Sequence, residues 1–303
     1  MNNKILAIII VFLGIIAILS SSKKETTFLI PKEQEEDIKV RIKDTSTKNI
    51  STIDLETYII GVVAGEMPAS FEVEALKAQA IASRTYAVYK MQTSSNDYDL
   101  VTDISNQVYI TEEEMQAKWK TQYQKYKDKI TEAVNDTKNL IMTYNDEVIS
   151  SFYFAISNGK TENVSSVFGE NKEYLKSVDS MDTNVNNFKV ETTISKRDFC
   201  SKLGIDCQTI VINNIKKNST NRVEEITINN KTFKGTEIRK LLNLRSTDFT
   251  FSIADSIKIT TYGYGHGVGM SQYGANEMAK NGSTYEEILK HYYQNINIVK
   301  NNV

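Results

Sequence analysis

A single carboxylate, Glu66, lies between an apolar run and a proline, and this setting suggests chemistry more than any other in the chain. The apolar residues 58–64 predict a buried helix. Because the residue before a proline is pushed out of the helical region, Pro68 should end that helix at Met67. We therefore expect Glu66 at the end of a rigid helix, where its side chain can project into a cleft.

The neighbours of Glu66 favour a general acid. A helix-terminal glutamate usually faces water, and that simpler interpretation stays open. However, the side chains nearby in sequence include Val63, Met67 and Phe71, which are apolar. A carboxyl group among such neighbours loses hydration, so its pKa rises and it keeps its proton near neutral pH. General-acid catalysis requires a carboxyl group in that state.

A helix predicted from residue 74 to about residue 90 carries two cations on one face. Lys77 and Arg84 stand at positions i and i+7 of that helix, two turns apart. We expect them to line one side of a cleft beside Glu66. A solvated helix face without a binding role explains the same spacing equally well.

Glycine alternates with larger residues at 263–269, directly before another predicted helix. The spacing is not the dinucleotide-binding fingerprint. Alternating glycines instead permit close approach by a ligand or by another backbone segment. Ser271 should cap a helix that runs to about Lys280, and the free N–H groups there suit sugar hydroxyls or a carboxylate. His266 and His291 are the two histidines of the chain, which argues against a multi-histidine metal site.

Three blocks of the sequence resemble the stage II sporulation protein D family. They are GEMP at 65–68 with EALKAQA at 74–80 and SRTY at 83–86, SNGKTE at 157–162, and YGHGVGMSQYGA at 264–275. The match spans roughly residues 50–298. The resemblance implies a lytic transglycosylase that acts on peptidoglycan during engulfment of the forespore, with Glu66 in the catalytic position.

The resemblance also implies roles for residues outside the Glu66 segment. It places His266 in the cleft, with Gln272 and Tyr273 touching substrate or supporting the groups that do. Taken alone, a lone histidine is more often structural. The loop that begins at Ser157 offers a hydroxyl and an amide to glycan hydroxyls, although plain turn chemistry accounts for the same residues. The expected substrate-binding residues are Lys77, Arg84, Ser157, His266, Ser271, Gln272 and Tyr273.

The chemistry that the resemblance implies is non-hydrolytic cleavage of the bond between MurNAc and GlcNAc. Glu66 would protonate the glycosidic oxygen and then act as base for the C6 hydroxyl of the same MurNAc, which closes a 1,6-anhydro ring. One carboxylate suffices for this reaction, whereas a hydrolase usually needs two. Two alternatives stay open. One is a wall-binding protein without catalysis that resembles the amidase enhancers, and the other is a hydrolase that pairs Glu66 with Glu56, Glu72 or Glu74.

Composition narrows the class of ligand. The chain of 303 residues has a formal net charge of -2 and a pI near 5.9, which argues against a nucleic-acid-binding protein. Several relatives carry cysteine or histidine in the region of residues 98–111, and this sequence has neither there, so we expect no zinc and no other cofactor. Cys200 and Cys207 are the two cysteines, and either a disulfide or two separate thiols fits their spacing.

The N-terminus predicts a membrane anchor. Residues 5–19 are apolar, and residues 1–22 form a marginal span because about 20 apolar residues usually cross a bilayer. A cleaved signal peptide is the alternative. The polar residues 23–37 should link the anchor to a catalytic domain at 38–303. We therefore expect a single-pass protein of the cell membrane whose domain is extracytoplasmic, on the mother-cell side of the engulfing septum.

The resemblance also indicates what the domain meets outside the membrane. It implies that the substrate is a peptidoglycan glycan strand free of stem peptides. It further implies collaboration with stage II sporulation proteins P and M.

Residues 38–303 predict an α+β fold, with mixed helices and β-hairpins around a catalytic cleft. Residues 38–42 alternate as a strand. Hairpins are expected at 140–155 and 223–233, where turn residues separate two strand patterns.

Two capping boxes predict helices in the same domain. One at 111–114 should open a helix that runs to about residue 136. Its aromatic stripe of Trp119, Tyr123 and Tyr126 is assigned to packing. The other, at 283–286, should open a helix that ends near Tyr293.

Overall fold

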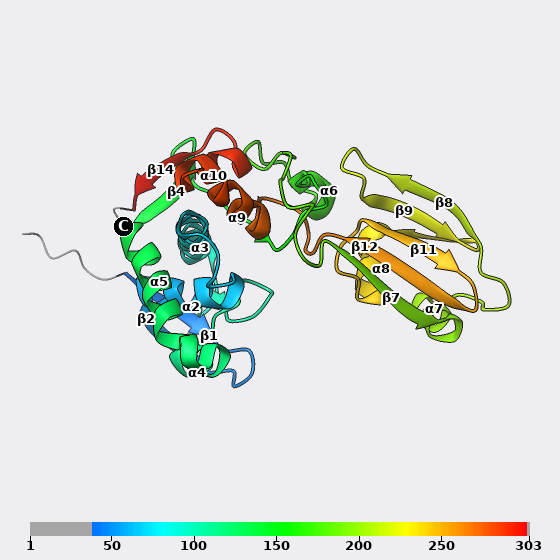
Figure 1. The fold of residues 1–303 in the computed structure, drawn as a ribbon, viewed down its shortest axis with the longest axis horizontal. Helices are drawn as coiled ribbons and strands as arrows, with labels where there is room; N and C mark the ends of the chain where they lie inside the picture. Colours follow the sequence, from blue (N-terminus) through cyan, green and yellow to red (C-terminus); the bar gives the residue numbers. More distant parts are fainter. Residues whose placement is uncertain (1–37, 302–303) are drawn as a thin grey trace, which may run out of the picture. The chain divides into compact units, whose positions relative to one another are not determined.

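Two hydrophobic cores organise residues 38–301, which are the residues that the computed structural model describes (Figure 1). The first core combines residues 40–175 with residues 268–296, and the second lies within residues 199–259. The second core is therefore inserted between two halves of the first. Helices and strands contribute to both, so the α+β class is confirmed.

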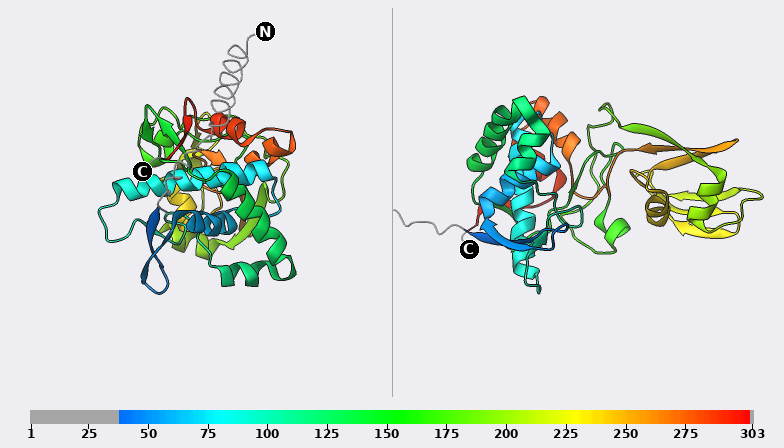
Figure 2. Two further views of the ribbon diagram at one scale, coloured as in Figure 1. Left: turned by 90° about the vertical axis from the view of Figure 1, so that its left-hand side faces the viewer. Right: turned by 90° about the horizontal axis from the view of Figure 1, so that it is seen from below.

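Helix α3 (Val73–Thr93) is the centre of the first core. Figure 1 shows it end-on among its neighbours, and Figure 2 shows the same grouping from two further directions. The neighbours are α2 (Leu55–Glu66), α5 (Tyr123–Asp136), α9 (Gln272–Lys280) and α10 (Tyr285–Tyr292). Nearly every residue of α3 from Ala75 to Val88 is buried, as expected of a helix surrounded by others.

Helix α2 ends where the proline predicted. At its start, Asp54 accepts a hydrogen bond from the Thr57 backbone N–H at 2.9 Å. At its end, Met67 is extended, with φ of -119° and ψ of 141°, directly before Pro68. The predicted break is confirmed, and it leaves Glu66 as the last helical residue.

Three small sheets complete the first core. The strand orders are β2-β1-β3 (Ile50–Asp54, Lys39–Lys43, Leu100–Val101), β14-β4-β5 (Asn297–Lys300, Leu140–Tyr144, Glu147–Val148) and the parallel pair β13-β6 (Met270–Ser271, Tyr153–Phe154). The short helix α6 (Val164–Phe168) follows β6. The β13-β6 pair joins the glycine-rich segment to the middle of the chain.

The hairpin predicted at 140–155 forms only in part. Asn145 and Asp146 have φ of 50° and 64°, as a two-residue hairpin turn requires, and β4 pairs with β5. The second strand ends at Val148 rather than at Ala155, because the chain beyond it pairs with β13 instead.

The single helix predicted from 111 to about 136 is wrong. The capping box of Thr111 and Glu114 forms, but the chain then builds α4 (Glu112–Trp119), a 3-10 turn η1 (Lys120–Gln122) and α5. Lys120 has a φ of 48°, which is incompatible with a continuous helix. Trp119 meets Tyr126 edge-on with ring centroids 5.7 Å apart, and the predicted aromatic stripe packs against the first core.

Two three-stranded sheets and two helices enclose the second core. The strand orders are β10-β9-β8 (Lys231–Lys234, Val223–Ile228, Ile212–Lys217) and β11-β12-β7 (Phe249–Ile253, Ser256–Tyr262, Lys189–Ser195). The helices are α7 (Lys196–Leu203) and α8 (Gly235–Leu242). The antiparallel pairing of β9 with β10 confirms the hairpin predicted at 223–233.

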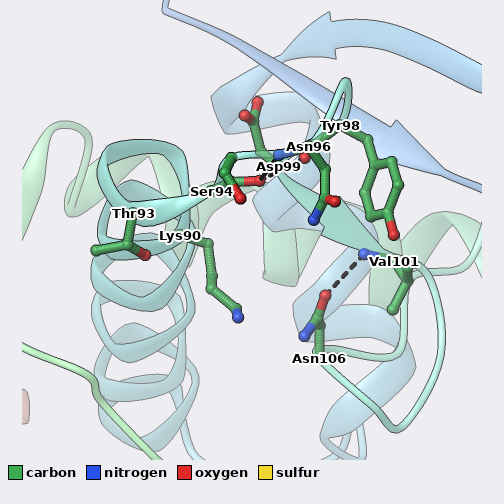
Figure 3. A pocket seen from close by; sticks show the side chains of 9 residues that line it. Lys90, Thr93, Ser94, Asn96, Tyr98, Asp99, Val101 and Asn106 are labelled. Atoms are coloured by element: carbon green, nitrogen blue, oxygen red, sulfur yellow. Dashed lines mark hydrogen bonds between the residues drawn. The ribbon is translucent and has the colours of Figure 1, made fainter.

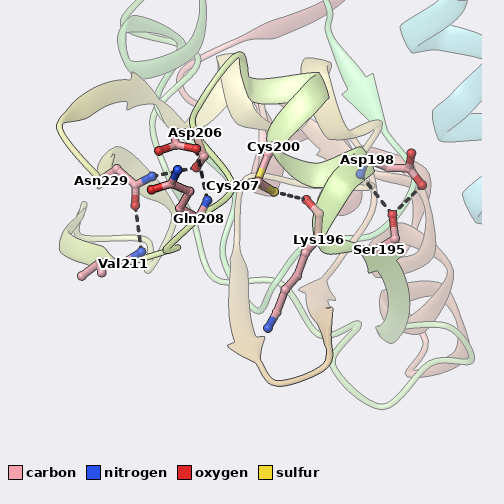
Figure 4. The surroundings of a disulfide bond; sticks show 9 residues. All are labelled: Ser195, Lys196, Asp198, Cys200, Asp206, Cys207, Gln208, Val211 and Asn229. Carbon is pink, nitrogen blue, oxygen red and sulfur yellow. Dashed lines mark hydrogen bonds between the residues drawn. A yellow bond between two sulfur atoms is a disulfide. The ribbon is translucent and has the colours of Figure 1, made fainter.

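Cys200 and Cys207 form a disulfide, which the spacing alone left open (Figure 4). Cys200 lies on α7, which Ser195 caps by accepting a hydrogen bond from the Asp198 N–H at 3.0 Å. The helix ends at Gly204, whose φ of 60° turns the chain back. The two cysteine Cα atoms are then 5.7 Å apart, within the range of a disulfide.

The last capping box is displaced by one residue from its predicted position. Thr284 and Glu287 form it, rather than Ser283 and Glu286, because α10 begins at Tyr285.

The predicted anchor at 1–22 and linker at 23–37 lie outside the described residues. Within residues 38–301, no helix combines the length and the apolar character that crossing a bilayer requires.

Candidate active site

Glu66 lies at the C-terminal end of α2 beneath a loop that crosses that end. The backbone N–H of Val108 donates to Glu66 Oε1 at 2.7 Å. Two glycines of α2 permit this approach. A Cβ at Gly65 would lie 2.4 Å from the Val108 carbonyl oxygen, and one at Gly61 would lie 2.3 Å from the Tyr109 ring. These helix glycines are therefore required by the loop rather than by the helix.

Burial raises the pKa of Glu66 above its ordinary value. Hydrogen bonds from Val108, Gln272 and Tyr153 and the charge of Lys118 act in the opposite direction, but burial outweighs them. The C-terminal end of a helix also carries partial negative charge, which disfavours a carboxylate. Glu66 therefore keeps its proton at a higher pH than an exposed glutamate would, as a general acid must.

Gln272 reaches Glu66 from the start of α9 and is held in place by α3. Its Nε2 donates to Gln79 Oε1 at 3.3 Å, and Gln79 Nε2 donates to Ser83 Oγ at 2.9 Å. All three side chains are buried. A chain of hydrogen bonds thus orients the Gln272 amide toward the carboxyl group.

Tyr153 is the other side chain that acts on the Glu66 carboxyl group as a donor and lowers its pKa. Its hydroxyl oxygen accepts from Gln107 Nε2 at 3.0 Å, and Gln107 Oε1 accepts from the Tyr58 hydroxyl at 3.1 Å. Because that oxygen already accepts, the Tyr153 proton is available to Glu66. Burial raises the pKa of Tyr153 well above its usual value, so it stays a neutral donor.

Lys118 is the cation whose charge acts on Glu66. Its ammonium group donates to the Ala64 carbonyl oxygen at 2.8 Å. That carbonyl belongs to the last turn of α2, where the helix dipole favours a cation. Lys118 therefore stabilises the helix end and, through its charge, a deprotonated Glu66.

Ser157 and Ser271 converge on Asp182 rather than on Glu66. The Ser157 backbone N–H donates to Asp182 Oδ2 at 2.6 Å, its hydroxyl donates to Oδ1, and the Ser271 hydroxyl donates to Oδ2 at 2.6 Å. All three side chains are fully buried. Ser271 caps α9 as predicted, accepting from the Gly274 N–H at 3.3 Å. This cluster fixes the start of the helix that carries Gln272, and substrate contact by either serine stays a prediction.

His266 lies in a box of aromatic rings. The ring centroids nearest to it are those of Phe152, Phe154 and Phe168, at 6.0, 5.8 and 5.5 Å. Its Nδ1 accepts a hydrogen bond from the Val268 N–H at 3.1 Å, so the neutral ring carries its proton on Nε2. Burial, together with the charge of Arg239, lowers the pKa of His266 to about 4. The ring is therefore neutral near pH 7.

The alternating glycines allow tight packing of the chain against itself. Gly263, Gly265, Gly267 and Gly269 all have positive φ. A Cβ at Gly269 would lie 1.9 Å from the Phe152 carbonyl oxygen. One at Gly267 would lie 2.9 Å from Arg222 Nη2. Of the two interpretations offered by the sequence, these contacts support close approach by another segment of the protein.

Lys77 and Arg84 both form ion pairs with carboxylates other than Glu66. Arg84 is fully buried and forms a two-pronged ion pair with Glu56, at 2.6 Å and 2.8 Å. Glu56 stands at the start of α2, about 15 Å along the helix from Glu66. Lys77 forms an ion pair with Asp136 at 2.9 Å. The expectation that both cations line a cleft beside Glu66 does not match this placement, and substrate contact by either stays a prediction.

Tyr273 lines a pocket of about 330 Å³. Its ring meets Phe71 edge-on with centroids 4.9 Å apart, and the amides of Asn184 and Asn276 also face the pocket. Phe71 follows Glu66 closely in the chain and Tyr273 follows Gln272. The pocket therefore joins the two segments that reach the acid with the segment at 184–186, and substrate binding by Gln272 and Tyr273 stays a prediction.

The loop in which relatives were expected to carry metal ligands packs on the acid here. Gln107 and Val108 of that loop both belong to the Glu66 network. Across residues 38–301, no group of three or more His, Cys, Asp or Glu side chains is arranged to hold a metal ion.

Sequence reasoning missed several supporting residues. Tyr153, Gln107 and Asp182 lie in loops or in a two-residue strand, where no periodic pattern marks them. Gln79 did leave a signal, because it is an amide within an otherwise apolar, alanine-rich stretch of α3. A polar residue inside a buried helix needs a partner, and its partners are Gln272 and Ser83.

Known proteins match this chain over most of its length. Residues 43–144 match the family model described as Stage II sporulation protein. The chain is 42% identical over 270 residues to Stage II sporulation protein D of Bacillus subtilis (strain 168), covering 86% of this chain and 79% of the relative. It is 40% identical over 284 residues to Stage II sporulation protein D of Bacillus amyloliquefaciens, covering 91% and 83%.

A more distant relative is the Amidase enhancer of Bacillus subtilis (strain 168). It is 28% identical over 293 residues, covering 77% of this chain and 39% of the relative. The high identity and coverage of the two Bacillus sporulation proteins confirm the resemblance carried by the three sequence blocks. The chain belongs to the stage II sporulation protein D family.

Proposed function

We propose that this protein is a lytic transglycosylase that cleaves MurNAc–GlcNAc bonds of peptidoglycan during sporulation and forespore engulfment. The observation that carries the proposal is a partly buried carboxyl group, Glu66, whose pKa is raised and toward which neutral donors are directed. A protonated carboxyl of this kind can donate a proton to a glycosidic oxygen at a pH where an exposed glutamate cannot.

In the first step Glu66 acts as an acid. Its proton passes to the oxygen that links C1 of MurNAc to GlcNAc, the C1–O bond breaks, and an oxocarbenium-like centre develops at C1. Glu66 is left as a carboxylate. The Val108 N–H, the Gln272 amide and the Tyr153 hydroxyl then hold the negative charge, and Lys118 stabilises it through its own charge.

In the second step Glu66 acts as a base. The C6 hydroxyl of the same MurNAc attacks C1 and gives its proton to the Glu66 carboxylate. A 1,6-anhydro ring closes and the acid is regenerated without the use of water. The same environment serves both steps. Burial favours the protonated form of Glu66, while the three donors lower the energy of its ionised form enough for it to occur in the reaction.

The disulfide supports a location outside the cytoplasm. Disulfides such as Cys200–Cys207 persist in oxidising compartments and are rare in the cytosol. The apolar segment predicted at 1–22 would hold the domain at the cell membrane, facing the wall on the mother-cell side of the septum. Collaboration with stage II sporulation proteins P and M belongs to the same proposal.

A non-catalytic role in wall binding is the second candidate, because one relative is named Amidase enhancer. Such a protein would bind glycan strands without cutting them. The raised pKa of Glu66 favours catalysis, since a binding surface gains nothing from a carboxyl group with a raised pKa.

A hydrolase with two carboxylates finds less support. Glu56 is occupied by Arg84, and Glu74 accepts from the Tyr285 N–H at 2.8 Å and pairs with Lys77. Glu72 is exposed at the start of α3.

Mass spectrometry of reaction products tests the proposal. The full-length protein is incubated with peptide-free glycan strands beside a Glu66→Gln variant, in which the amide can still accept from Val108. We expect anhydro-MurNAc ends from the wild type and none from the variant. Strand binding without products would favour the wall-binding role, and reducing ends that lack the anhydro ring would favour a hydrolase.

A further inference from the structure

A second pocket, of about 350 Å³, opens at the C-terminal end of α3 (Figure 3). Its lining is largely polar and includes Lys90, Ser94, Asn96, Tyr98 and Asn106. Figure 3 shows the Lys90 side chain extending from α3 into the space between that helix and the loop that carries Asn106.

Lys90 is the cation among the described residues that line this pocket. No carboxylate within residues 38–301 forms an ion pair with its ammonium group, which lies 5.9 Å from the centre of the Tyr86 ring. The carboxylate that lines the pocket, Asp99, is already neutralised by Arg41, whose Nη2 lies 2.5 Å from Oδ1 and whose backbone N–H donates to Oδ2 at 2.8 Å. A polar pocket with one unneutralised cation suits an anionic group.

One face of α3 connects this pocket to the active site. Gln79, Ser83, Tyr86 and Lys90 stand at positions i, i+4, i+7 and i+11. Gln79 and Ser83 belong to the chain of hydrogen bonds behind Gln272. Ser83 and Lys90 are about 10 Å apart along the helix axis. The pocket therefore lies along α3 beyond the residues that support Gln272.

The loop at 102–110 provides a second connection. Asn106 lines the pocket, and Val108, two residues later, donates to Glu66. Two residues of extended chain span at most about 7 Å. Asn106 is itself held, since its Oδ1 accepts from the Val101 N–H at 2.8 Å and its Nδ2 donates to the Tyr86 hydroxyl at 3.4 Å. The acid and the pocket therefore share a rigid wall.

We propose that this pocket is a subsite of the glycan-binding cleft that takes a carboxylate of a muramyl residue near the cleaved bond, with Lys90 as the charged contact. The inference rests on the proposed function. A muramyl residue carries a free lactyl carboxylate when its stem peptide has been removed, and an amide when the peptide is attached. A charge-assisted hydrogen bond from Lys90 favours the carboxylate, so the subsite selects peptide-free strands.

Binding measurements test the subsite independently of catalysis. The full-length protein in detergent carries Glu66→Gln so that strands are not cut, and Lys90→Gln is compared in that background. Lys125→Gln is the matched control, because Lys125 is an exposed lysine of α5 outside both pockets. Kd is measured for peptide-free strands, for the same strands with their lactyl carboxylates amidated, and for peptide-bearing strands.

We expect Lys90→Gln to raise Kd about tenfold for peptide-free strands at low salt, with the loss shrinking as salt is added. Amidated strands should bind both forms equally, and Lys125→Gln should change neither. Lys90→Arg, which keeps the charge, should keep the discrimination and shows that the fold tolerates substitution here. An equal loss on amidated strands, or no loss on peptide-free strands, overturns the proposal. A loss confined to peptide-bearing strands also overturns it, because the carboxylate would then belong to the stem peptide.

The subsite and the proposed function can fail separately. If the wild type releases no anhydro ends but Lys90 still discriminates between carboxylate and amide, the transglycosylase assignment fails and the subsite stands. If anhydro ends appear but Lys90→Gln binds every strand as well as the parent, the subsite fails and the transglycosylase assignment stands.

Discussion

The two ends of α2 carry the same residue type in opposite environments. Glu56, in the first turn, binds Arg84 through both carboxylate oxygens. Glu66, the last residue, is partly buried and has neutral donors around it. The helix dipole strengthens the contrast, because it favours a carboxylate at the start of a helix and disfavours one at the end.

This difference shows how one helix supports both stability and chemistry. A carboxylate matched with a buried guanidinium holds α2 against α3. A carboxyl group whose burial is not offset by a bound cation keeps its proton and can deliver it. The four predictions that follow test the two environments, from the largest expected effect to the smallest.

Breaking the ion pair at the start of α2 should cost the most stability. Arg84→Met leaves Glu56 without its cation in a site where Arg84 is fully buried. We expect the free energy of unfolding to fall by about 3–5 kcal/mol, measured by urea denaturation. The double variant Arg84→Met, Glu56→Gln should recover part of the loss. A loss below about 1 kcal/mol, the value of a surface pair, would contradict the comparison.

His266 is a second group for which burial outweighs charge. Its pKa is about 4 in the folded protein, against an ordinary value of 6.5. Because the folded pKa is depressed, the stabilisation is complete above pH 6.5 and is lost as the pH falls toward 4, by at most about 3 kcal/mol. Unfolding free energies at pH 7 and pH 4.5 should therefore differ less for His266→Asn than for the wild type. Equal pH dependence in both proteins would show that His266 is not buried neutral.

Tyr153→Phe should weaken catalysis without removing the acid. The variant loses a hydroxyl donor to the Glu66 carboxylate, and a hydrogen bond to a charged group is worth about 1.5–3 kcal/mol, so the rate should fall about 10- to 100-fold. The loss of a donor that lowers the pKa of Glu66 should also move its ionisation to higher pH. Tyr123→Phe is the matched control, since the Tyr123 hydroxyl donates to the exposed Glu112. Similar rate losses in both variants would remove Tyr153 from the mechanism.

Glu66→Gln should have the smallest effect on stability. Because the folded pKa of Glu66 is raised, the stability of the wild type is complete below its unfolded value of 4.5 and declines as the pH rises through the folded pKa. The variant lacks this decline. Calorimetric Tm values should therefore match near pH 4 and favour the variant slightly at pH 8. A variant that is markedly less stable at pH 8 would mean that the charged form is stabilised.

Local sequence patterns correctly predicted the helices that carry this site. The proline after Met67 located the end of α2, the alanine-rich run located α3, and the capping position of Ser271 located α9. Each signal lies within a few residues of the structure that it predicts, so no tertiary information was needed. The direction of the pKa shift of Glu66 was also predicted, but the groups that act on its carboxyl group, Val108, Gln272 and Tyr153, come from distant segments.

Contacts between distant segments were beyond the sequence. Arg84 has the spacing of a cleft residue, yet its partner is 28 positions away in the chain. Ser157 and Ser271 meet at Asp182, and nothing in a turn-rich sequence marks that meeting point. The break at Lys120 depends on how α4 and α5 pack together, which a capping pattern does not encode.

The proposed acid catalysis requires a protonated Glu66. Carbon-13 NMR of the glutamate carboxyl groups measures this protonation directly. Glu66→Gln assigns the signal by removing it, and Glu56 serves as an internal comparison on the same helix. We predict that the Glu66 signal titrates clearly above pH 4.5. A midpoint at or below 4.5 would show that Glu66 is ionised as readily as a glutamate in water, and it could not then serve as the acid.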